Sequence, residues 1–127
     1  MGGLRMEISE CYEQFGGDYE GVLARMLSEE RVAKFARKFL LDDNYYKLTK
    51  AVAEEHCEEA FRAVHTLKSI CQNLGFVRLY GASSRLTEEL RGHIEFRDPD
   101  RVSELMERIN EEYDSIIAAL SNLSEDA

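Results

Sequence analysis

The sequence predicts an all-α protein, an up-and-down antiparallel four-helix bundle with additional short helices at its N-terminal end. Three observations support this prediction. The 127 residues include one proline, no tryptophan and 44% hydrophobic residues, a composition typical of a soluble globular protein with few helix breakers. Apolar residues recur at spacings of three and four, the pattern of amphipathic helices. Helix start and stop signals separate these segments, and the connections between them are short, as in helical bundles.

The first 40 residues are expected to form short helices that flank the bundle. Gly16-Gly17 is a stop signal after a first helix of about residues 6–15, and Asp18 and Ser28 are candidate N-caps for two more helices. Asn44 is a candidate cap for the helix that follows the polar run 42–44. The helix after Ser28 has an apolar stripe expected to face the core, made of Val32, Phe35, Ala36, Phe39 and Leu40.

Four longer helices are expected at about residues 44–56, 58–74, 77–92 and 99–122. Burial of their apolar stripes is expected to stabilise the fold by roughly 1.5–3 kcal/mol for each large side chain. Gly75 directly follows the second stripe as a natural left-handed helix end, and Asp98-Pro99 is a strong helix start. The expected core residues are Tyr45, Leu48, Val52, Ala60, Val64, Leu67, Cys71, Leu74, Leu79, Ala82, Leu86, Leu90, Val102, Leu105, Ile109, Tyr113, Ile116, Leu120 and Leu123.

Length and charge restrict the possible functions. A chain of 127 residues suits a single domain over residues 1–127, with residues 1–5 and 124–127 expected to be frayed. The net charge of −9 disfavours binding to nucleic acids and to anionic membranes. No stretch approaches the roughly 18 apolar residues of a membrane span, and the first residues lack the apolar run of a signal peptide. A cytoplasmic protein is therefore expected.

The three cysteines are expected to be structural. Cys11, Cys57 and Cys71 form no CxxC pair and are odd in number. We therefore expect reduced thiols, at least one of them in the core.

One face of the 58–74 helix carries residues that the core does not explain. At about 100° per residue, His65 lies roughly 140° from the centre of the apolar stripe and is expected to face solvent. Lys68, Ser69 and Gln72 follow at i+3, i+4 and i+7 and extend this polar face. Phe61, one turn before His65, indicates either a docking surface or packing under the helices of residues 29–40.

Basic residues gather in the same part of the chain. Between residues 62 and 91 there are five of them against two acidic residues, Glu88 and Glu89, a net charge of +3 in an acidic chain. A positive patch centred on an exposed histidine is expected to suit a phosphoryl group or an acidic partner. The five basic residues are Arg62, Lys68, Arg78, Arg85 and Arg91.

A family resemblance is carried by two segments, Ala63-Val64-His65-Thr66-Leu67-Lys68-Ser69 and Asn73-Leu74-Gly75. They resemble the signature of histidine phosphotransfer (HPt) domains, with the terminal glycine ten residues after the histidine. The resemblance extends weakly over nearly the whole chain. It implies that His65 is the phospho-acceptor and that Lys68 is the cation accompanying the phosphoryl group.

This sequence departs from the family pattern at three positions. Ser69 stands where the family normally has glycine, and its small side chain is expected to preserve docking of a partner. Val64 stands where alanine is common. Some members carry glutamine and arginine on the neighbouring helix, and the matching positions here are Thr87 and Arg91, of which only Arg91 agrees.

The resemblance implies a carrier of phosphoryl groups in a two-component phosphorelay, with response-regulator receiver domains and a hybrid histidine kinase as partners. The receiver is expected to supply the aspartate and a magnesium ion, so we expect no cofactor and no metal ligands in this chain. A kinase is not expected, because the sequence lacks the G-x-x-x-x-G-K-[ST] phosphate-binding loop. The candidate docking residues are Phe61, Arg62, Ser69, Gln72 and Arg91.

Two other functions remain as alternatives. A helical adaptor or scaffold without phosphotransfer would also display an exposed histidine. A carboxylate-bridged metal enzyme would need Glu-x-x-His pairs, and this motif is absent at His56, His65 and His93. The sequence names neither the kinase, the regulator nor the stimulus, and is compatible with a separate protein or a module of a larger kinase. A monomer is the simplest expectation, although the long last helix could support a dimer.

Overall fold

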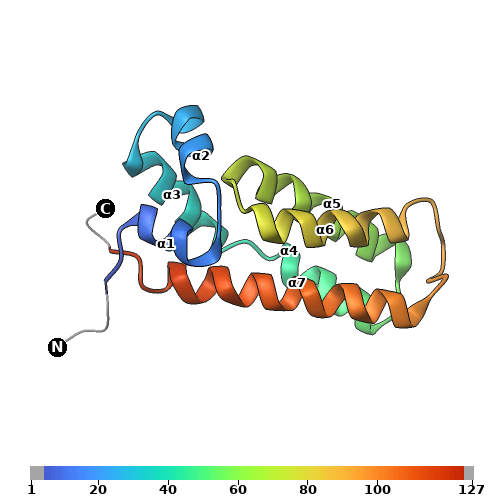
Figure 1. Cartoon of the computed structure of the whole chain (residues 1–127). Helices are drawn as coiled ribbons and strands as arrows, with labels where there is room; N and C mark the ends of the chain where they lie inside the picture. Colours follow the sequence, from blue (N-terminus) through green and yellow to red (C-terminus); the bar gives the residue numbers. More distant parts are fainter. Residues whose placement is uncertain (1–4, 125–127) are drawn as a thin grey trace.

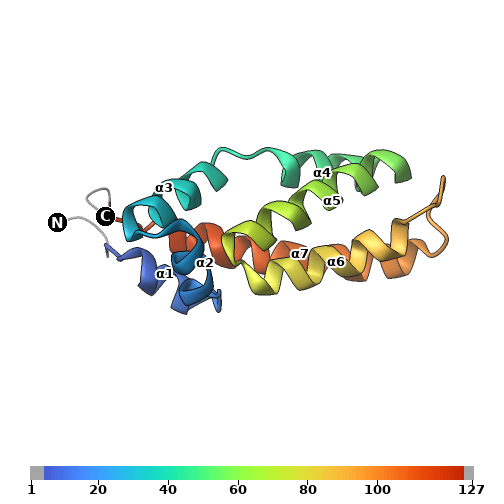
Figure 2. The same ribbon diagram turned by 90° about the horizontal axis from the view of Figure 1, so that it is seen from above.

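The computed structural model describes residues 5–124 and contains seven α-helices in that range (Figure 1). They are α1 (Ile8–Phe15), α2 (Tyr19–Met26), α3 (Glu29–Phe39), α4 (Asn44–Ala53), α5 (Cys57–Leu74), α6 (Val77–Leu90) and α7 (Pro99–Leu120). Helices α4 to α7 form the bundle, and α1 to α3 lie at one end of it, beside the C-terminal end of α7 (Figures 1 and 2). The all-α prediction is confirmed. Within residues 5–124, no helix is long and apolar enough to cross a membrane.

The helix boundaries agree with the prediction to within a few residues. The side chains of Asp18 and Ser28 cap α2 and α3 as predicted, each accepting a hydrogen bond from a backbone amide three residues later. Asn44 does not cap α4, which corrects the prediction. It is the first residue of that helix, and its backbone N–H group donates a hydrogen bond to the carboxylate of Asp42 at 2.9 Å. Asx-type bonds of this kind compete with a regular cap.

One hydrophobic cluster includes buried residues from all seven helices. The predicted core residues of α5, α6 and α7 are buried, whereas Tyr45, Val52 and Leu123 are partly buried against the cluster. The prediction is wrong for Phe35 and Leu40, which are each 39% exposed. The buried stripe of α3 is narrower than expected and leaves these two residues at its edges. A single domain over the whole chain stays a prediction, which this shared core supports.

The cysteines are all in the interior of the protein. Cys11, Cys57 and Cys71 are buried and free of disulfides. Burial raises the pKa of each thiol above its usual value, which disfavours the reactive thiolate. The expectation of core thiols is therefore confirmed.

The C-terminal end of α5 is held by α1 and α2. Gly75 ends the helix in the left-handed conformation, with φ of +70°. Tyr12, Asp18 and Arg25 donate hydrogen bonds to the carbonyl groups of residues 72–75. Carbonyls at a helix end otherwise lack partners inside the helix. The short N-terminal helices thus fix the end of the helix that carries His65.

We expect Gly75→Ala to lower the free energy of unfolding by about 1–3 kcal/mol, because a residue with a Cβ is strained in the left-handed region. The added Cβ would also lie 2.8 Å from the carbonyl oxygen of Asp18. Urea unfolding followed by circular dichroism measures the change. Gly81→Ala is the matched control, since this glycine lies within α6 and a Cβ there would meet nothing within 4 Å. It should raise the stability by roughly 0.5–1 kcal/mol, and equal losses in both variants would contradict this account.

Ser124, which we expected to be frayed, forms backbone hydrogen bonds to other parts of the protein. The amide of Ser124 donates to the carbonyl of Met6 at 2.8 Å, and the guanidinium of Arg37 binds the Ser124 carbonyl. An isolated β-bridge joins Met6 to Leu123 alongside these bonds. The fraying predicted for residues 1–4 and 125–127 lies outside the described residues.

Candidate functional site

His65 lies near the middle of α5, on the face that points away from the core. Its side chain is exposed, whereas the flanking Val64 and Leu67 are fully buried. Neighbouring positions on a helix differ by about 100°, so burial of these two residues directs the imidazole outward. Helix α5 packs against both α4 and α6 (Figure 2). The imidazole therefore stands on a surface bordered by these two helices.

An aromatic ring links His65 to a cation from α6. The centroid of the Phe61 ring lies 5.8 Å from that of the imidazole, with 35° between the ring planes. The guanidinium carbon of Arg91, the residue that ends α6, lies 5.3 Å from the Phe61 centroid. The Phe61 ring is partly buried against the core. These ring contacts are with α5 and the end of α6, and not with the helices of residues 29–40 that we considered as an alternative.

A second cation lies one turn beyond the histidine on α5. Lys68 is partly buried, and its ammonium nitrogen lies 5.9 Å from the ring centroid of Tyr80 on α6. This distance is within the range of a cation–π interaction. The contact holds the lysine side chain on the α6 side of α5.

An ion pair at the end of α6 joins Arg91 to Glu88. The guanidinium of Arg91 binds the carboxylate of Glu88 through Nη2 at 2.9 Å and through Nε at 3.2 Å. Arg91 lowers the pKa of the Glu88 carboxyl, and the charges of Lys68 and His65 lower it further. Glu88 raises the pKa of Arg91 in turn. The sequence analysis counted Glu88 only as a charge, because nothing in the sequence shows which partner it contacts.

The five basic residues between residues 62 and 91 do not form the single patch that we expected. Lys68 and Arg91 have ring contacts on the α6 side of α5. Arg62 lines a groove between α4 and α5, and Arg78 and Arg85 line a groove between α6 and α7. The prediction is wrong because a charge count along the chain does not separate the faces of a helix.

Two other predicted site residues follow His65 on α5, one and two turns later. Ser69 and Gln72 are exposed, and the Ser69 hydroxyl donates to the backbone carbonyl of His65 at 3.2 Å. Thr87 is fully buried, and its hydroxyl donates to the Ser83 carbonyl at 2.7 Å. A buried side chain at this position, the one at which the resemblance implied glutamine in some members, is not available to a group on the surface.

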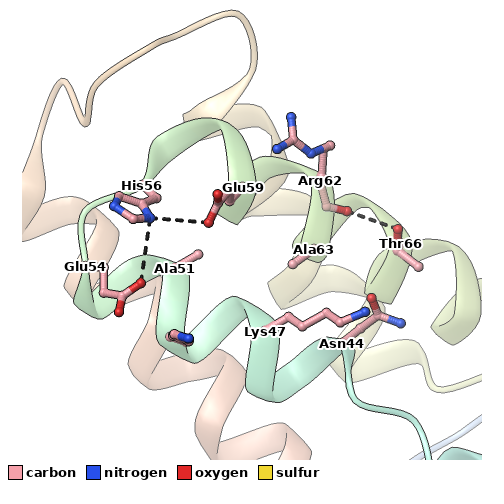
Figure 3. A pocket seen from close by; sticks show the side chains of 10 residues that line it. Asn44, Lys47, Ala51, Glu54, His56, Glu59, Arg62, Ala63 and Thr66 are labelled. Carbon is pink, nitrogen blue, oxygen red and sulfur yellow. Dashed lines mark hydrogen bonds and ion pairs between the residues drawn. The ribbon is translucent and has the colours of Figure 1, made fainter.

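Two grooves flank the exposed face of α5. The groove between α4 and α5 has charges of both signs (Figure 3). In it, His56 lies 3.2 Å from Glu59 and 3.7 Å from Glu54 (Figure 3), and Lys47 lies 3.4 Å from Asp43. Many of its charges are therefore already paired within the protein.

The second groove is mainly apolar and was missed by the sequence analysis. It lies where α2 and α3 meet the C-terminal part of α5, and Ile70 is the first residue of α5 that lines it. No stripe on a single helix predicts it, because three helices contribute its walls. Its lining residues are Met26, Phe35, Lys38, Phe39, Asp42, Ile70, Asn73 and Leu74.

The acidic, histidine and cysteine side chains do not form a metal centre in the part of the chain that the structure describes. Among residues 5–124 there is no group of three or more such side chains that could hold a metal ion. The charged groups near His65 include the cations Lys68 and Arg91 and the carboxylate of Glu88.

The fold and this surface define a class of protein, a helical bundle that displays a histidine and a lysine on the outer face of one helix. Residues 28–122 match the family model described as the Hpt domain. The match covers most of the chain, from the cap of α3 to the residues after α7, and the protein belongs to the Hpt domain family. No curated protein and no solved structure gives a significant match. The family carries out histidine phosphotransfer in phosphorelays.

Proposed function

We propose that this protein carries a phosphoryl group on His65 between the aspartates of receiver domains. The observation that carries the proposal is an exposed imidazole in a member of the Hpt family, with the Lys68 ammonium group one turn away on the same helix. An exposed imidazole is accessible to a partner, and a cation beside it offsets the charge of the phosphoryl oxygens. Response-regulator receivers and a hybrid histidine kinase are the proposed partners.

The proposed transfer exchanges one bond to phosphorus for another. The lone pair of an unprotonated ring nitrogen of His65 attacks the phosphorus of an aspartyl phosphate on the receiver. The N–P bond forms while the bond from phosphorus to the aspartate oxygen breaks, and the aspartate leaves as a carboxylate. The proton on the other ring nitrogen stays in place. The same step in reverse delivers the phosphoryl group to the next aspartate.

Positioning and charge neutralisation dominate phosphoryl transfer, so the demands on this chain are small. It must hold the imidazole outward, which the buried residues on either side of His65 achieve. It must also present a cation, which we assign to Lys68. We propose that the receiver brings the magnesium ion.

We propose that the receiver docks on the exposed face of α5 around His65, on the residues predicted from the sequence, Phe61, Arg62, Ser69, Gln72 and Arg91. The apolar groove between α2, α3 and α5 borders this surface, because Asn73 lines it and is turned by only about 80° from His65 around α5. An apolar groove beside a polar active surface supplies the area that a specific interface needs.

A label-transfer experiment tests the proposed function. A receiver domain phosphorylated on its aspartate is mixed with the protein, and the label is expected to appear on the protein as acid-labile, base-stable phosphate. Incubation with magnesium and ATP alone is expected to leave the protein unlabelled, because a carrier has no nucleotide site. Failure of several receivers to label the protein would favour the adaptor alternative, and labelling by ATP alone would contradict the carrier assignment.

A further inference from the structure

The carboxylate of Glu88 interacts with the cluster of His65, Phe61, Lys68 and Arg91, through an ion pair with Arg91 and through the charges of Lys68 and His65. Helices α5 and α6 are antiparallel neighbours (Figure 2). Lys68 contacts Tyr80 near one end of this pair of helices, and Phe61 contacts Arg91 near the other. Glu88 lies between the two contact points along α6. It therefore belongs to the stretch of α6 that flanks His65.

The ion pair removes much of the positive charge that Arg91 would otherwise offer to an anion at His65. Both carboxylate oxygens of Glu88 engage the guanidinium, at 2.9–3.2 Å. The guanidinium also lies over the Phe61 ring, which in turn contacts the imidazole. Arg91 is thus linked to His65 through the Phe61 ring, and its charge is already paired with that of Glu88. Within residues 5–124, Lys68 forms no ion pair of this kind with an acidic side chain.

A phosphoryl group on His65 would add close to two negative charges at this surface. The Glu88 carboxylate repels those charges, and its pairing with Arg91 weakens the attraction that would offset them. Both effects disfavour the phosphorylated state relative to the free histidine. Neither effect involves Glu88 in the bonds that form or break, since the transfer only exchanges an O–P bond for an N–P bond.

We infer that Glu88 is a positioning residue that biases His65 toward handing its phosphoryl group on rather than storing it. This inference rests on the proposed function of His65. It predicts that the equilibrium between phosphohistidine and receiver phospho-aspartate depends on the charge at position 88. Without that charge, Lys68 and an unpaired Arg91 would both stabilise the phosphoryl group.

The test measures the equilibrium ratio of label on the protein and on one receiver for the wild type, Glu88→Gln, Glu88→Asp and Glu89→Gln. Glu88→Gln is expected to shift the equilibrium toward phosphohistidine by about two- to fivefold, the range that exposed charges allow. Glu88→Asp keeps the charge and should retain the wild-type ratio. Glu89→Gln is the matched control, because position 89 is turned by about 180° from Tyr80 around α6, and it should also leave the ratio unchanged.

Salt separates an effect of charge from a change of structure. Raising the ionic strength from about 0.1 M to about 1 M shortens the Debye length from about 10 Å to 3 Å, so the difference between Glu88→Gln and the wild type should shrink. An unchanged ratio in Glu88→Gln, or an equal shift in Glu89→Gln, would overturn the inference while leaving the proposed function intact. If the wild type takes up no label at all, the proposed function fails instead.

Discussion

His65→Gln is expected to reduce phosphoryl uptake from receiver domains by more than about 1,000-fold, the scale seen when a nucleophile is removed. The glutamine side chain is polar and of comparable length, but its amide nitrogen has no available lone pair and cannot form the N–P bond. His65 is exposed on α5, so the substitution should change the free energy of unfolding by less than about 0.5 kcal/mol. Label transfer and urea unfolding of the same variant measure both quantities.

The other two histidines provide matched controls. His56 is placed between Glu54 and Glu59 at the start of α5, and His93 lies 3.3 Å from Arg97 in the connection between α6 and α7. His56→Gln and His93→Gln should both take up label as the wild type does. Label that persists in His65→Gln and disappears in either control would assign the phosphoryl group to another histidine and refute our proposal.

Much of the fold could be predicted from the sequence because the interior of a bundle demands a regular pattern. The stripes of α5, α6 and α7 face one shared core, so spacing alone identifies their buried residues. The same reasoning failed at Phe35 and Leu40 because α3 lies at the end of the bundle, where a narrower stripe of that helix is covered. It failed at Asn44 because Asp42, two residues earlier, binds its amide. Packing partners and local side-chain bonds, which spacing does not encode, decide such positions.

In the candidate site, too, the contacts within one helix could be predicted from the sequence, whereas the contacts between two helices could not. His65 and Lys68 could be predicted together because both lie on one helix, where a separation of three residues places them on one face. The pairing of Glu88 with Arg91 over Phe61 could not, because it depends on how α6 is set against α5. Arg78 and Arg85 were assigned to the wrong surface for the same reason, since they line the groove toward α7. Residues that act across two helices require the structure.

Lys68→Ala is expected to lower the maximal rate of phosphoryl transfer by about 10- to 100-fold. Removing one hydrogen-bond donor to the transition state from an enclosed active site lowers the rate by about 100- to 1,000-fold. The loss is smaller because this site is open to solvent, although a docked receiver excludes part of the water. The lysine lies one turn from the imidazole, and its contact with Tyr80 keeps it on that side. Rates measured over a range of phosphorylated receiver concentrations should show a lower maximal rate with a much smaller change in half-saturating concentration.

Two further variants determine whether the charge or the location of Lys68 produces this effect. Lys68→Arg keeps a cation on the same face and should recover part of the rate, because the guanidinium differs from the ammonium group in shape and hydration. Lys50→Ala removes the same charge from α4, in the groove on the other side of α5, and should leave the maximal rate unchanged. Equal losses in Lys68→Ala and Lys50→Ala would mean that the net charge of the docking surface matters and that Lys68 does not act on the phosphoryl group. A loss confined to position 68 would place its ammonium group at the oxygens of the phosphoryl group during transfer, since only a short-range interaction distinguishes these two lysines.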